Sequence, residues 1–172
     1  MNEIKRIDTV QQYNDYFGME TLHPLVTVID AREANPVHFC PKLYNLYAIL
    51  MKDPDCGTLK YGRSIYDYQQ GTTGTFRRSG QVMGSDDDGQ LHQPGGWLLA
   101  FHPELVRNTP LAQFIKNYSF FSYSANEALH LSEQERRTII DCMCKIREEL
   151  LHPIDKHTKS LITDNINSYL IM

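Results

Sequence analysis

The chain has 172 residues, of which 41% are hydrophobic and 22% charged, and its 17 basic and 21 acidic side chains give a formal net charge of −4. This length fits one ordinary domain, and no apolar run approaches the roughly 18 residues that a membrane-spanning helix needs. The acidic balance and the scattered basic residues argue against strong binding of a phosphate backbone by this chain. The N-terminus carries charges of both signs and no apolar stretch before a cleavage site, so we expect a cytoplasmic protein.

Two local signals predict how the fold begins. Thr9 and Gln12 fit a capping box, and Gly18 is placed to end a helix in a left-handed turn, so we expect a short helix between them. The β-branched apolar run at 25–29 is typical of a buried strand, and residues 44–51 form the next expected strand.

The middle of the chain is harder to interpret. Residues 59–68 place aromatic and polar groups on both faces of an expected strand, which suits either a small barrel with a partly open interior or a packed sandwich core. Residues 71–80 hold three glycines and two arginines, which is unusual for a central strand, and a bulge is expected there. Residues 85–89 predict a turn, because Asp88-Gly89 is a favoured hairpin pair. A calcium loop is rejected, because counting from Asp86 would place Trp97 where a bidentate Glu is required.

The C-terminal third predicts helices. After a strand at 97–101 and short helices at 103–106 and 110–118, two longer helices follow and should be antiparallel, since their connection is short. The first begins at a capping box, Ser132 to Glu135. Its apolar positions recur at steps of four, three and four and form one narrow seam: Ile139, Met143, Ile146 and Leu150. Either the rest of the domain or a second copy of the chain must cover this seam.

Four cysteines are spread through the chain: Cys40, Cys56, Cys142 and Cys144. The last two are two residues apart in an expected helix, so their side chains point to different faces. This pattern predicts neither a disulfide framework nor a zinc site, and it fits a reducing compartment. We expect no metal and no cofactor.

Three sequence blocks together resemble the N-terminal cupin-like domain of bacterial AraC-type transcriptional regulators: Phe17 to Asp30, Tyr61 to Gly71 and Gly95 to Glu135. The resemblance implies a mainly β fold with a C-terminal α segment. It implies a cupin-like (double-stranded β-helix) barrel with a short N-terminal helix over residues 1–125, followed by an antiparallel helix pair for dimerisation at 126–172. A helix-turn-helix DNA-binding region is expected beyond residue 172. Where relatives typically end a strand in Pro-Gly-Gln, this chain has Arg77-Arg78-Ser79-Gly80-Gln81, a departure that affects the local register.

The expected function is ligand sensing and dimerisation without catalysis. The likeness implies a homodimer, an unidentified small-molecule effector and contact with DNA only through the further C-terminal region, with no membrane partner. Aromatic faces and an arginine suit a small ligand, so the candidate binding site comprises Tyr61, Arg63, Tyr66, Tyr68, Trp97 and Phe101. The competing interpretation is that the aromatic residues are core and that Arg63 pairs with Asp67 or Asp30. The seam Ile139, Met143, Ile146 and Leu150 is the expected dimer contact.

Two alternatives stay open. One is a small metal-dependent cupin enzyme, an isomerase or dioxygenase, which would need an unusual ligand set because the chain lacks a His-x-His pair; His38 and His92 are its best candidate ligands. The other is a barrel that binds no ligand and only joins subunits. No dinucleotide-binding, P-loop, zincin or nucleophile-elbow motif is present.

Overall fold

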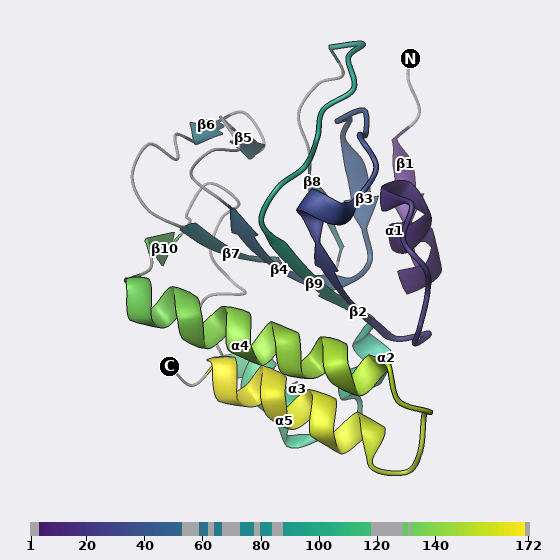
Figure 1. Cartoon of the computed structure of the whole chain (residues 1–172), viewed down its shortest axis with the longest axis vertical. Helices are drawn as coiled ribbons and strands as arrows, with labels where there is room; N and C mark the ends of the chain where they lie inside the picture. Colours follow the sequence, from purple (N-terminus) through teal and green to yellow (C-terminus); the bar gives the residue numbers. More distant parts are fainter. Residues whose placement is uncertain are drawn as a thin grey trace.

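A five-stranded antiparallel sheet lies at the centre of the computed structural model, which describes residues 4–52, 59–61, 64–66, 73–77, 80–83, 88–117, 129–130 and 132–170 (Figure 1). The strand order is β10 (Leu129–His130), β7 (Thr73–Arg77), β4 (Tyr47–Lys52), β9 (Trp97–Phe101) and β2 (Val26–Asp30). Strand β9 pairs along its whole length with both β4 and β2. The strands predicted at 25–29 and 97–101 and most of the one predicted at 44–51 therefore form the middle and one edge of a single sheet, whereas Tyr44 belongs to a separate strand, β3.

Two smaller sheets accompany the central one. Strand β3 (Lys42–Tyr44) lies between β1 (Lys5–Ile7), to which it is parallel, and β8 (Gln81–Met83), to which it is antiparallel. Strands β5 (Leu59–Tyr61) and β6 (Ser64–Tyr66) pair with each other. Because Tyr61 is paired with Ser64, the chain reverses direction between them, so the prediction of one continuous strand over 59–68 was wrong.

The helices are α1 (Val10–Phe17), the 3-10 helix η1 (Ala31–Glu33), α2 (Pro103–Val106), α3 (Pro110–Asn117), α4 (Glu133–Leu150) and α5 (Thr158–Leu170). Helices α4 and α5 run antiparallel beneath the central sheet, as predicted (Figure 1). The capping boxes at Thr9 and Ser132 are both confirmed, and each satisfies two backbone N–H groups that the first helical turn leaves unpaired. Gly18 ends α1 in the left-handed conformation, with φ of 71°.

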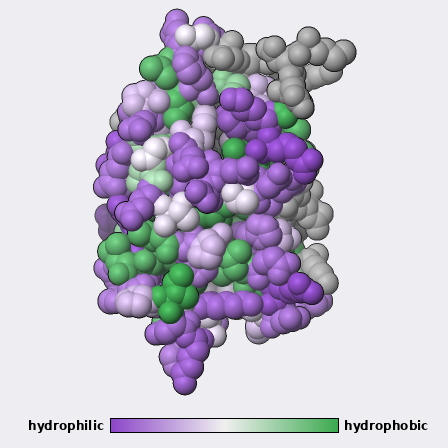
Figure 2. Space-filling model, turned by 90° about the vertical axis from the view of Figure 1, so that its right-hand side faces the viewer, coloured by the Kyte–Doolittle hydropathy of each residue, from purple (hydrophilic) through white to green (hydrophobic). Residues whose placement is uncertain are grey.

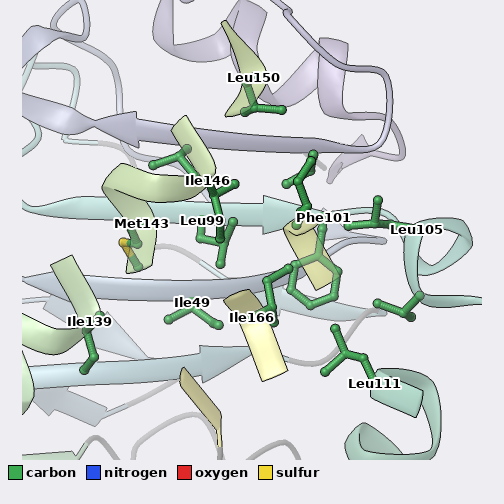
Figure 3. Close-up of a cluster of buried hydrophobic side chains, with 14 of the residues drawn as sticks. Ile49, Leu99, Phe101, Leu105, Leu111, Ile139, Met143, Ile146, Leu150 and Ile166 are labelled. Atoms are coloured by element: carbon green, nitrogen blue, oxygen red, sulfur yellow. The ribbon is translucent and has the colours of Figure 1, made fainter. Parts of the chain in front are cut away.

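Alternate residues of a strand point to opposite sides of the sheet, and in β2, β4 and β9 side chains on both sides are buried. On one face, Val28, Ile49 and Leu99 pack against side chains of α2 to α5. We call this cluster the helix-side core, and Figure 3 shows the side chains of α4 and α5 directed toward the strands. On the other face, Ile29 and Leu98 pack against α1, η1 and β3. We call this second cluster the α1-side core.

The predicted cupin-like barrel is contradicted. The fold is mixed α/β, with helices that form a full layer over one face of an open sheet, and among the residues described the strands do not close into a barrel. Continuous apolar runs such as residues 97–101 indicate a strand covered on both faces, and a sheet between two layers satisfies that requirement as well as a barrel does. The five residues of β7 pair with β4 in unbroken register, and positions 71, 72, 78 and 79 of the segment in which a bulge was expected lie outside the described residues.

Candidate functional site

The predicted ligand site is only partly within the described side chains. Arg63 and Tyr68 lie outside the described residues, and Tyr61 and Tyr66 are described by their backbone alone. Phe101 is fully buried, and its ring stacks on Tyr47 with centroids 5.3 Å apart, so it belongs to the helix-side core. For Phe101 the core interpretation holds rather than the ligand interpretation.

Trp97 occupies a different environment, four residues earlier on the same face of β9. Its ring is partly exposed, and the guanidinium carbon of Arg147 lies 5.9 Å from the ring centroid. Arg147 is in the last turn of α4 and also donates to Glu33 of η1, with Nη2 2.7 Å from Oε2. One arginine thus joins α4 to the end of β9 and to the segment that follows β2.

A second arginine–carboxylate pair completes this corner of the sheet. Asp30, paired with Trp97 across β2 and β9, accepts from Arg32 at both carboxylate oxygens, at 3.0 Å from Nε and 2.8 Å from Nη2. These side-chain hydrogen bonds hold the pKa of Asp30 below its usual value, and the positive charge of Arg147 acts in the same direction, against the effect of burial. We call the set Asp30, Arg32, Glu33, Trp97 and Arg147 the Arg147 junction.

The junction offers an aromatic face beside the Arg147 guanidinium, and both of its arginines are already paired with carboxylates. A ligand carboxylate at this place would compete with Glu33 for Arg147, and an apolar ring could pack on Trp97. Sequence reasoning identified Trp97 and missed the two arginines. Arg147 lies four residues after Met143 and three before Leu150, at the edge of the predicted seam, and this position was the available signal.

The predicted dimer seam lies inside the chain. Its four side chains, 1%, 2%, 1% and 7% exposed, all belong to the helix-side core: Ile139, Met143, Ile146 and Leu150. Figure 3 shows Ile139, Met143 and Ile146 directed toward the strands that carry Ile49 and Leu99. These side chains are therefore not available to a second copy, because the central sheet already covers them.

Of the two histidines singled out as candidate metal ligands, His92 has other partners. The ring of His92 stacks on Phe39 at 5.1 Å, and its Nε2 lies 2.7 Å from a carboxylate oxygen of Asp88. The hydrogen bond from His92 is one of the contacts that keep the pKa of Asp88 below its usual value, after the larger effect of the Gln90 backbone N–H. Over the described part of the chain, no group of three or more His, Cys, Asp or Glu side chains is arranged to hold a metal ion.

The α4–α5 turn carries the most exposed apolar side chains of the helical layer. Leu151, Ile154 and Leu161 are 71%, 57% and 46% exposed. Figure 2 shows hydrophobic residues in the lower half of this side of the molecule, interspersed with hydrophilic ones. A shallow open hollow beside Leu161 is lined by side chains such as Glu149 and Asp155.

No known protein family matches the chain, and no curated protein sequence is similar to it. Within the described residues, every helix is too short or too polar to cross a membrane.

Proposed function

We propose that this chain is the sensory part of an AraC-type transcriptional regulator, which performs no chemistry and transmits a change at its central sheet to helices α4 and α5. The likeness of the three sequence blocks to that family supports this function. DNA would be bound by helix-turn-helix units C-terminal to α5. A closed barrel is not required, because the proposed function needs only a central sheet whose structural change alters the position of helices α4 and α5.

The observation that carries the proposal is the Arg147 junction. Arg147 connects the last turn of α4 to Glu33, in the 3-10 helix that follows β2, and to Trp97, the first residue of the neighbouring strand β9. A ligand that competes for Arg147 or packs on Trp97 would therefore change the position of α4 relative to the sheet. Such a ligand regulates the protein only if it binds one arrangement more tightly than the other.

The proposal also includes a homodimer, and the buried seam of α4 limits how it can form. A second copy would have to use surface residues, because the helix-side core occupies the seam completely. The molecular mass of the purified chain in solution tests this part: a mass near twice 19.9 kDa supports the homodimer, and a monomer at all concentrations contradicts it.

The first test of the whole proposal is to read the gene past the codon for Met172. The proposal requires two in-frame helix-turn-helix units there, and a stop codon at that point in the native gene would overturn it.

The second test compares two arginine variants of α4 in the full-length protein. Arg147→Ala breaks the junction, whereas Arg137→Ala removes an equal charge whose partner, Glu133, is on the same helix. We expect Arg147→Ala to change transcription from the promoters that the protein occupies, at unchanged protein level, and Arg137→Ala to leave it as in the wild type. Equal transcription in all three proteins would contradict a role of the junction in signalling.

A further inference from the structure

Lys42 is a buried lysine without an anionic partner in the described structure. It lies on β3, is 3% exposed, and its ammonium approaches Cys40, with Nζ 3.1 Å from Sγ and 3.4 Å from the carbonyl oxygen. The ring of Tyr16, from α1, lies 3.7 Å below the same nitrogen. Within the described residues, no ion pair joins Lys42 to a carboxylate.

Burial of an ammonium group is unfavourable unless a negative charge or several strong acceptors compensate it. A carbonyl dipole and an aromatic face give partial compensation. The sulfur of Cys40 is the third group in contact with the ammonium. Cys40 is also partly exposed, so reagents in solution can reach it.

The neighbouring tyrosines do not supply a negative charge to compensate the Lys42 ammonium. Burial raises the pKa of Tyr13 and of Tyr44, so both phenols stay protonated at neutral pH. The hydroxyl of Tyr16 donates to the carbonyl oxygen of His38 at 2.6 Å, which fixes its ring beneath the ammonium. The cluster therefore combines one fixed cation with one accessible sulfur.

We propose that Cys40 is an oxidative modification site, whose sulfur, in contact with the Lys42 ammonium, reacts with small hydroperoxides. The thiolate sulfur attacks one peroxide oxygen, an S–O bond forms and the O–O bond breaks. Hydroxide, or an alkoxide, leaves and takes a proton from solvent. The sulfur is oxidised by two electrons to a sulfenic acid, and the peroxide is reduced by the same two electrons.

Oxidation would also change the packing between α1 and β3. An oxygen added to the sulfur would disturb its contact with Lys42, so the buried ammonium would lose one of its partners. We expect the oxidised protein to unfold at a lower urea concentration than the reduced protein.

The decisive measurement is the rate at which iodoacetamide alkylates Cys40 at pH 7, followed by peptide mass spectrometry in the native protein and in urea. A neighbouring ammonium raises the reactivity of a cysteine sulfur toward alkylating reagents, so the contact with Lys42 should raise the rate in the folded protein. We expect native Cys40 to react about tenfold faster than unfolded Cys40. An equal or slower native rate would overturn the proposal, and this comparison needs no variant.

Two lysine variants separate the effect of the contact from the effect of net charge. Lys42→Met removes the ammonium and keeps an apolar stem of similar size, so it should fold. Lys5→Met removes the same charge at the exposed position paired with Lys42 on β1. We expect Lys42→Met to abolish the native rate advantage and Lys5→Met to retain it; loss of the advantage in both variants would refute the role of the contact.

Two further cysteines serve as internal controls for hydrogen peroxide treatment. Burial raises the pKa of the Cys142 and Cys144 thiols, so they should react slowly. With dimedone as the trapping reagent, we expect the sulfenic acid adduct at Cys40 to form first. Adducts that form equally fast at all three positions would contradict a specific site.

Discussion

Substitution of Met143 distinguishes a core position from a dimer contact. Met143 is 2% exposed and belongs to the helix-side core between α4 and the central sheet. Truncation of such a side chain to alanine costs about 2–5 kcal/mol, through lost burial and the cavity that it leaves. Because the total free energy of unfolding of a domain is about 5–15 kcal/mol, Met143→Ala should remove a large part of it.

The assay is urea denaturation followed by circular dichroism. With a urea dependence of about 1–3 kcal/mol per M, we expect the unfolding midpoint of Met143→Ala to fall by about 1–3 M. Leu151→Ala is the matched control on the same helical layer, because Leu151 is 71% exposed, and it should shift the midpoint by less than about 0.5 M. An unchanged midpoint for Met143→Ala, together with a change from dimer to monomer, would refute the assignment of Met143 to the core.

Three further predictions concern single positions. Burial lowers the pKa of His23, whose Nδ1 accepts a hydrogen bond from the Leu25 N–H, so folding favours the neutral form. The free energy of unfolding should therefore be at its full value above the unfolded pKa near 6.5. It should decline as the pH falls through the lowered folded pKa. His23→Gln should weaken this decline, measured as the urea midpoint at pH 7 and pH 5; an unchanged decline would contradict the argument. Ser132→Ala removes the N-cap of α4 and should cost about 0.5–2 kcal/mol in the same assay, against no loss for the exposed Ser160→Ala. Gly18→Ala should destabilise the protein, because a Cβ there would overlap the Asn35 side chain and because alanine disfavours this left-handed backbone conformation. A thermal midpoint equal to that of the wild type would contradict this argument.

The elements that sequence predicted correctly depend on neighbours in the chain. The capping boxes at Thr9 and Ser132 involve residues three positions apart, so their geometry follows from sequence alone. The long-range partners did not follow. Glu33 and Arg147 are 114 positions apart, and no local pattern links them. Among the predicted ligand residues whose side chains are described, Trp97 alone is partly exposed and lies beside a charged group.

The prediction of the α4 seam shows why a periodic pattern is incomplete evidence. The spacing correctly identified which side chains of α4 are buried, among them Met143 and Ile146. It did not say what buries them, because a sheet of the same chain and a helix of a second copy demand the same apolar face. The barrel prediction failed for a related reason: apolar strands require cover on both faces, and the helical layer provides one of the two.

The two proposed sites meet through one strand. Val28 faces the helix-side core and its neighbour Ile29 faces the α1-side core, so β2 is in contact with both layers. The same strand ends at Asp30, directly before the segment that binds Arg147. Helix α1 carries Tyr16, whose ring contacts Lys42. A change in the packing of α1 could therefore reach α4 through β2, because a single layer of side chains separates the sheet from the helices on each face. Hydrogen exchange of the α4 amides, compared between reduced and Cys40-oxidised protein, measures whether that route transmits a change in stability.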